Sequence, residues 1–402
     1  VGLTGQQRHY SSLSDMLDTA QWMGVRVGPV DLVNLPVGPQ DTLACVQFGL
    51  FLIDDGVARF AVLMRGPSQH GEMPSVVLEV LAPDEERGRA FLREIRDLTV
   101  ELNVFRRKVI SFGESPMGYH GIGPIVFYDR PSVARDDLVL ADGVLESVER
   151  QVIDVARHRD RLRASNQHVK RGLLLHGPPG TGKTLTVRYL VSVAQDHTVV
   201  LLTGGALHLV RHAVALARLL QPSLVVLEDV DLVAQERGMA PGFSNPFLYD
   251  VLNVMDGIEE DADVAFLLTT NRADLLEPAL AARPGRVDLA VEIVLPDELA
   301  RRRLIELYGR GLDLRLEDLG AIVQRTSGVT ASFIKELMRK AAVLAAGRGD
   351  GDGRLTVGDA EVHAALDELQ AEESALTRVL LGGELQTRRR PGTEWIAPLG
   401  EE

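Results

Sequence analysis

The 402-residue sequence contains a single cysteine, Cys45. One cysteine excludes an intrachain disulfide and any zinc site built from several cysteines, and it favours a cytoplasmic location. No uninterrupted apolar run approaches the ~18 residues that a membrane crossing requires, so we expect no membrane segment in this chain. Cations are in the minority, with 43 Lys and Arg against 57 Asp and Glu. Since nucleic-acid binding depends on clustered cations, we expect no nucleic-acid partner.

The remaining composition, 45% hydrophobic and 25% charged, is ordinary for a globular protein. The length predicts two or three domains, each with its own core. From changes in pattern along the chain we predict four parts: an α+β N-terminal domain at 1–134, a large α/β domain at 135–296, a helical lid at 297–372 and a poorly ordered tail at 373–402.

The N-terminal part has the pattern of short strands and one helix. Alternating or apolar runs predict strands at 42–53, 57–64, 75–81 and 109–112. Asp54-Asp55-Gly56 predicts a tight turn, and apolar spacing predicts a helix over 91–102. Breaks at Gly123-Pro124 and Arg130-Pro131 predict a linker over 121–137. Binding of a protein substrate or adaptor and simple packing are both open as roles for this domain.

The strongest motif is a glycine-rich stretch that joins an apolar run, 172–176, to a helical segment, 183–194. Its residues are, in order, Gly177, Pro178, Pro179, Gly180, Thr181, Gly182, Lys183, Thr184 and Leu185. Such glycines let successive backbone N–H groups face one anion, and the helix adds its positive N-terminal end. In this arrangement Lys183 reaches the β- and γ-phosphates and the Thr184 hydroxyl ligates Mg²⁺. A strand-to-helix turn without a ligand is the alternative.

Strand-like runs alternate with helices around this loop, which predicts a parallel sheet covered on both faces. The predicted strands are 172–176, 198–202, 223–228, 264–270 and 291–294, and a helix is predicted over 144–162. Beyond Leu295-Pro296-Asp297 the pattern is wholly helical, with helices predicted at 300–307, 316–324, 332–346 and 359–369. The fold class predicted is therefore α/β, a P-loop NTPase parallel sheet with a helical lid, preceded by a small α+β domain.

Polar side chains follow two of the predicted strands. Glu228 and Asp229 come directly after the apolar run 224–227. At the carboxyl end of a parallel strand, one acid can hold the water shell of Mg²⁺ while the next polarises an attacking water. Asn271 ends another apolar strand and can hydrogen-bond that water or the γ-phosphate, although Asn is also favoured in turns and helix caps.

Together with the run from Pro278 to Asp288, these motifs resemble the AAA ATPases over about residues 135–345. The resemblance implies that Lys183 and Thr184 are the Walker A pair and that Asn271 is the polar sensor. It implies that Glu228 and Asp229 are the Walker B pair, which shares Mg²⁺ with Thr184. It further implies that Arg283 and Arg286 reach the γ-phosphate of a neighbouring subunit. The partner is then another copy of the chain in a homo-oligomer, expected to be a hexamer. The cofactors that the resemblance implies are ATP and Mg²⁺.

Three departures from the family pattern leave two functions open. The Walker B acids stand in the order Glu then Asp, as in the mitochondrial AAA proteins that translocate folded Rieske protein. The segment 203–221 lacks the aromatic pore loop of many relatives, and no arginine stands at 331–333, so we assign no lid sensor. The first function is an ATPase that remodels a protein partner. The second is a nucleotide-gated assembly scaffold with little hydrolysis.

Overall fold

The structure is a computed structural model that describes residues 2–3, 12–22, 27–66, 76–113, 125–231, 246–272, 287–348 and 353–371. Its contacts divide the chain into two compact units. The first unit comprises residues 1–131, 155–171 and 191–267, and the second comprises residues 132–154, 172–190 and 268–402. No helix among the described residues combines the length and hydrophobicity that a membrane crossing requires.

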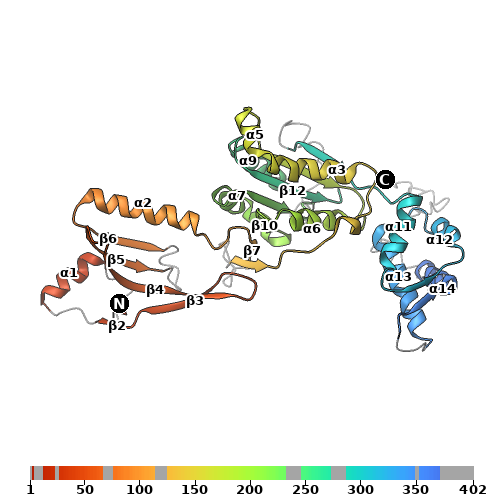
Figure 1. The fold of residues 1–402 in the computed structure, drawn as a ribbon, viewed down its shortest axis with the longest axis horizontal. Helices are drawn as coiled ribbons and strands as arrows, with labels where there is room; N and C mark the ends of the chain where they lie inside the picture. Colours follow the sequence, from red (N-terminus) through yellow and green to blue (C-terminus); the bar gives the residue numbers. More distant parts are fainter. Residues whose placement is uncertain are drawn as a thin grey trace, which may run out of the picture. The chain divides into compact units, whose positions relative to one another are not determined.

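The N-terminal part of the first unit is an antiparallel sheet with a helix on each face (Figure 1). Its strands, in spatial order, are β3 (Asp31–Pro36), β4 (Thr42–Asp54), β5 (Arg59–Arg65) and β6 (Val77–Leu81). Alternate residues of β5 face opposite sides. On one side Phe60 stacks on Phe91 of α2 (Glu85–Glu101), and on the other Leu63 packs with Met16 of α1 (Leu13–Trp22). A separate two-stranded antiparallel sheet pairs β1 (Gly2–Leu3) with β2 (Val27–Gly28), and α1 lies between these two strands in the sequence.

Three predicted strands, the turn and the helix of this part are confirmed, with shifts at their ends. The turn is closed by Asp54 Oδ1, which accepts from Gly56 N at 3.0 Å, and Gly56 has a φ of +82° that favours glycine. The helix begins earlier than its apolar spacing indicates. Asp84 caps it by accepting from Arg87 N at 2.9 Å, and this places the start at Glu85.

In the part of the chain that the structure describes, the larger sheet has seven strands in the order β13-β9-β12-β11-β10-β7-β8. Within the first unit, β10 (Thr198–Leu202) runs parallel to both β11 (Ser223–Leu227) and β7 (Val109–Phe112), and β8 (Ile125–Tyr128) pairs antiparallel with β7. The other strands are β9 (Arg171–His176), β12 (Val264–Thr270) and β13 (Leu289–Glu292), and β13 is parallel to β9. The predicted strands of the α/β part are confirmed, and of the four strand pairs just described β7–β8 alone is antiparallel.

Strands β7 and β8 differ from the prediction in where they belong. We assigned 109–112 to the N-terminal domain and 121–137 to a linker, whereas both strands extend the larger sheet. All four residues of β7 are buried, so the strand requires cover on both faces, and the interior of the larger sheet provides it.

The helix predicted over 144–162 is interrupted. It comprises α3 (Val144–Glu149), a π-helical turn at Arg150–Asp154, α4 (Val155–Arg157) and α5 (Arg159–Ala164). The predicted helix after the glycine-rich loop is α6 (Lys183–Val193). In the first unit a 3₁₀ segment, Gly204–Leu209, leads into α7 (Val210–Leu219), which packs against β10, β11 and α9 (Pro246–Asp256).

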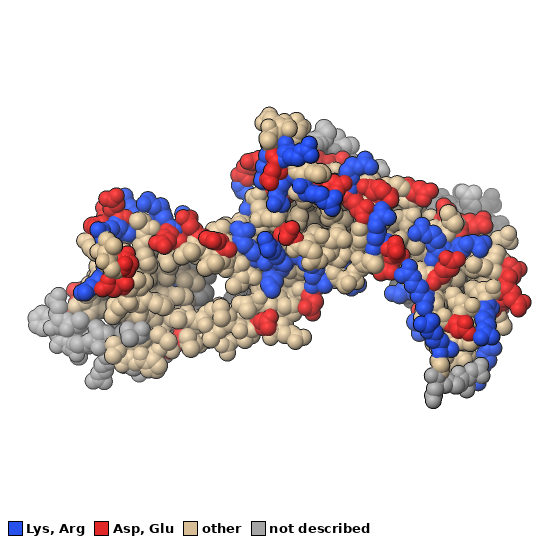
Figure 2. All heavy atoms as spheres, in the orientation of Figure 1, with Lys and Arg blue, Asp and Glu red and all other residues tan. Residues whose placement is uncertain are grey.

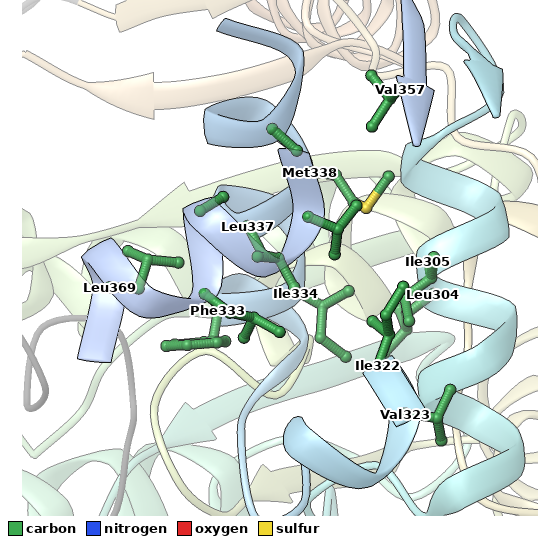
Figure 3. Packing of buried hydrophobic residues seen from close by; sticks show 14 of the residues in the cluster. Leu304, Ile305, Ile322, Val323, Phe333, Ile334, Leu337, Met338, Val357 and Leu369 are labelled. Atoms are coloured by element: carbon green, nitrogen blue, oxygen red, sulfur yellow. The ribbon is translucent and has the colours of Figure 1, made fainter. Parts of the chain in front are cut away.

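The lid region of the second unit has its own apolar core (Figure 3). Side chains of α11 (Glu298–Tyr308), α12 (Leu319–Arg325), α13 (Ala331–Ala346) and α14 (Asp359–Ala371) meet in it. The first three helices begin where Asp297, Asp318 and Thr330 accept backbone N–H groups, which confirms the predicted helices near their predicted starts. The prediction of a wholly helical pattern is wrong at one place, because β14 (Asp313–Arg315) pairs with β15 (Thr356–Gly358).

A buried polar cluster lies in the first unit. The Arg171 guanidinium donates to Asp263 Oδ1 at 2.7 Å, and both side chains are 2% exposed. The His197 ring lies beside them, with its Nε2 3.4 Å from Arg171 Nη2. Burial, and then the charge of Arg171, lowers the pKa of His197 from about 6.5 to about 4. The folded chain therefore keeps His197 neutral at pH values where the unfolded chain protonates it.

The stability of the first unit should consequently fall in acid. Stabilisation by neutral His197 is complete above pH 6.5 and is lost as the pH falls toward 4, at up to about 1.4 kcal/mol per pH unit. Between pH 7 and pH 5 we expect wild type to lose about 2 kcal/mol more than His197→Gln, measured by urea unfolding. His168→Gln, at an exposed histidine, should keep the wild-type pH profile. Parallel profiles for wild type and His197→Gln would contradict the assignment.

Candidate functional site

The glycine-rich loop lies between β9 and α6 in the second unit, as predicted. Its glycines have φ values that other residues rarely adopt, +134° at Gly177, +76° at Gly180 and +114° at Gly182. A Cβ at Gly177 would stand 2.4 Å from the backbone oxygen of Ile293, so the loop is pressed against the segment after β13. A Cβ at Gly182 would meet nothing within 4 Å, which shows that the loop is open on that side.

Lys183 is the first residue of α6, and its side chain folds back over the loop. Its Nζ donates to Gly177 O and Pro178 O, each at 2.8 Å, and the residue is 6% exposed. The Thr181 hydroxyl also donates to Pro178 O, at 2.9 Å. The next side chain, Thr184, is exposed. The 11-residue helix carries no acid in its first turn, so its positive end is not neutralised by its own side chains.

These features fit the polyphosphate of ATP with Mg²⁺. A buried ammonium, a curled backbone and a helix N-terminus are the groups that hold a phosphate chain. An exposed threonine hydroxyl next to that lysine is the usual protein ligand for the magnesium ion. The residues that would hold the phosphates are those of the loop, from Gly177 to Leu185, and Thr184 would hold the metal.

The lid touches the loop through the first turn of α13. Ser332 N donates to Gly180 O at 3.0 Å, and a Cβ at Gly180 would stand 3.0 Å from Ser332 Oγ and 3.1 Å from Thr330 Oγ1. Sequence reasoning placed no nucleotide sensor at 331–333, and it missed this contact. The hydrogen bond involves the backbone N–H of Ser332, so no residue type at that position signals it.

A small cavity of about 50 Å³ adjoins the loop in the second unit. Two segments frame it: the linker segment, residues 132–141, and the hinge segment, residues 292–297, from which the lid begins. Most of its lining is apolar: Val139, Leu140, Ala141, Val144, Ile293, Val294, Leu295, Pro296, Ala300 and Ala331, with Thr181 of the loop, Glu292 and Asp297. The apolar lining of this cavity, beside a phosphate loop, suits a flat aromatic base, but the cavity would have to widen to admit one.

The predicted acids lie in the first unit, directly after β11. Glu228 N donates to Leu202 O at 3.1 Å, which continues the β10–β11 ladder by one bond. Asp229 has a φ of +51°, in the left-handed region. Asp enters that region more readily than most residues, including Glu, which gives a structural reason for the shorter acid to stand second. Backbone strain of this kind is concentrated at functional sites.

Of the other predicted site residues, Asn271 lies in the part of the chain that the structure describes. Asn271 directly follows β12 in the second unit, half-buried, and the next residue, Arg272, donates its N–H to Thr270 Oγ1 at 2.9 Å. Arg283 and Arg286 lie outside the described residues. The roles given to Glu228, Asp229, Asn271 and the two arginines stay predictions. Among the described residues no group of three or more His, Cys, Asp or Glu is placed to bind a metal ion.

Comparison with known proteins gives a family and a set of relatives. Residues 173–295 match the family described as "ATPase family associated with various cellular activities (AAA)". The chain is 34% identical over 272 residues to "ATP-dependent zinc metalloprotease FtsH 2" of Sphaerobacter thermophilus, covering 65% of this chain and 41% of that protein. It is 30% identical over 295 residues to "ATP-dependent zinc metalloprotease FtsH 1" of Thermomicrobium roseum, covering 70% and 42%.

The chain thus spans about two fifths of the length of these relatives. Their names describe zinc metalloproteases. The sequence of this chain contains ten histidines, and none of them is followed by glutamate, so it has no His-Glu-x-x-His motif. The similarity to the two proteins extends over 65% and 70% of this chain.

Proposed function

Because residues 173–295 form an ATPase domain of the AAA family, whose members use ATP and Mg²⁺, we propose that this chain hydrolyses Mg·ATP in an oligomeric ring and uses the energy to remodel a protein partner. The observation that carries the proposal is the loop geometry around Lys183, with its buried ammonium and positive-φ glycines. A ring of six subunits and a cytoplasmic location are part of the proposal.

In this proposal, different residues of the chain bind the nucleotide and carry out the steps of hydrolysis. The loop N–H groups and Lys183 bind the phosphates, and the apolar cavity beside the linker segment orients the base. Asp229 accepts the proton of the attacking water, and Asn271 orients that water. When bound, Mg²⁺ neutralises charge on the phosphate oxygens, with Thr184 and Glu228 as its protein ligands. Arg283 and Arg286 of a neighbouring subunit stabilise the charge that develops in the transition state.

The N-terminal sheet would select the protein partner. Residues 27–58 contain no Lys or Arg, and several of their large apolar side chains are exposed, among them Leu35 at 46%, Leu43 at 52% and Leu52 at 71%. Figure 2 shows few charged side chains where β3 and β4 lie, in contrast to the mixed charges over α2. Exposed apolar surface of this kind supports a role in protein binding.

Hydrolysis is tested by steady-state phosphate release. We expect Asp229→Asn to lower turnover about a hundredfold, because the amide cannot accept the proton of the attacking water. Asp196→Asn, at an exposed acid that precedes β10, is the matched control and should retain wild-type turnover. Equally low rates for wild type and Asp229→Asn, together with ATP-dependent assembly, would instead support the nucleotide-gated scaffold.

A further inference from the structure

One arginine of the lid makes polar contacts with the linker segment, whose Val139 also packs against the apolar core of the lid. Arg310, just beyond the end of α11, donates from Nη1 to Asp137 Oδ1 at 2.8 Å and from Nη2 to the backbone oxygen of Asp136 at 3.3 Å. The two bonds leave the same planar guanidinium, so they fix both the distance and the angle between α11 and the linker segment. All of these groups lie in the second unit.

The linker side of this contact is itself anchored. Asp137 Oδ2 accepts from Ala134 N at 3.2 Å, which holds the carboxylate against its own turn. Arg135 donates to Glu146 at 2.7 Å and to Glu149 at 3.2 Å, and both acids belong to α3. The linker segment is therefore fixed to α3 at the place where Arg310 reaches it.

A buried hydroxyl extends the anchor to the helix of the phosphate loop. Tyr189 of α6 is 5% exposed and donates its hydroxyl to Glu149. Burial, and then the hydrogen bond to Glu149, raises the pKa of Tyr189 to about 12, so the hydroxyl remains a donor at neutral pH. One polar chain thus runs from α6 through Glu149 and Arg135 to the turn that holds Asp137.

The contact also bridges two walls of the cavity beside the loop. From Asp137 the linker segment continues to Val139, Leu140 and Ala141, which line one side of it. The lid contributes Ala300 of α11 and Ala331 of α13. Outward movement of α11 would therefore open the cavity and, at the same time, break the bonds from Arg310.

We propose that Arg310 is a positioning residue for the nucleotide: its bonds to Asp137 and Asp136 hold the lid closed against the linker segment and slow the release of adenine nucleotide from the cavity between them. This inference rests on the proposed function, because it requires a nucleotide at that site. The pair is partly exposed, 57% at Arg310 and 39% at Asp137, so its effect is modest. Loss of such a pair corresponds to a change of about two- to fivefold.

The experiment measures the dissociation rate of a fluorescent ADP analogue, chased with excess ADP, on the full chain. Arg310→Ala should release the analogue about two- to fivefold faster than wild type, and Asp137→Ala should change the rate in the same direction. The double variant should release it no faster than Arg310→Ala alone, because the second substitution has no contact with Arg310 left to remove. The reversed pair, Asp137→Arg with Arg310→Asp, should return toward the wild-type rate.

The matched control is Arg315→Ala. Arg315 also lies in the lid and pairs with Asp313 at 3.0 Å, but this pair does not involve the linker segment, so its loss should leave the release rate unchanged. The thermal midpoint of each variant without nucleotide should stay near that of wild type, which separates positioning from general stability.

Two results would overturn the inference. Equal release rates for wild type and Arg310→Ala would show that the contact does not hold the lid. If the double variant increased the release rate by the product of the two single-variant factors, Arg310 and Asp137 would act independently. Failure of wild type to bind the analogue at all is a different outcome, because it overturns the proposed function and this inference with it.

Discussion

Arg283→Ala is expected to hydrolyse ATP roughly 10³-fold more slowly than wild type, and Arg286→Ala to show a loss of the same kind. A guanidinium donated in trans stabilises the transition state of phosphoryl transfer by about 10³ to 10⁵ in rate. Nucleotide binding should be retained, because the Arg283→Ala subunit keeps the loop around Lys183 that binds the phosphates. Turnover and the affinity for a fluorescent ATP analogue, measured on the same preparation, separate the two effects.

Mixing two inactive variants tests whether the arginine acts between subunits. Lys183→Ala lacks the loop lysine but keeps Arg283, whereas Arg283→Ala keeps the loop. In mixed rings, an Arg283→Ala subunit beside a Lys183→Ala subunit has a complete site, so activity should reappear above that of either variant alone. Absence of recovery in rings shown to contain both variants would mean that each arginine serves its own subunit or none.

Asp263→Asn is expected to lower the free energy of unfolding by about 3–5 kcal/mol, because it leaves the Arg171 guanidinium as a buried charge without its carboxylate. The matched control is Asp261→Asn, at an exposed acid two residues earlier, which should stay within about 0.5 kcal/mol of wild type. Urea unfolding at pH 7, where His197 is neutral in the folded chain and mostly neutral in the unfolded chain, measures the difference.

A double variant shows whether the charge or the cavity is responsible. Replacing both partners by apolar residues of similar size, Arg171→Met with Asp263→Leu, should cost less than Asp263→Asn alone, because no buried charge remains. If Asp263→Asn stays within about 1 kcal/mol of wild type, the pair contributes little to the folded state.

Local patterns in the sequence sufficed to predict the elements around the loop. The strand β12 has the bounds predicted for it, since seven consecutive buried residues end at a polar Asn. The lid helices were predicted because apolar spacing and capping residues coincide at their starts. Strands β14 and β15 were missed because three residues are too few to show a period.

Such local patterns could not predict contacts between residues that are far apart in the sequence. The pairing of β7 with β10 joins Ile110 to Val200, and no residue in either strand specifies the other. The same holds for Gly177 against Ile293 and for Arg310 with Asp137. Motifs predicted the chemistry of the candidate site residue by residue, whereas its surroundings depend on segments whose side chains look ordinary in sequence.

The membership of β7 and β8 in the larger sheet has a consequence for where this protein can be divided. A fragment that starts at residue 135 would lack both strands and would expose one edge of β10, a strand with Val199 and Val200 fully buried. Unpaired apolar edges of this kind recruit other chains and aggregate. A nucleotide-binding fragment that is to remain monodisperse must therefore retain Val109–Phe112, well inside the part that the sequence assigns to another domain.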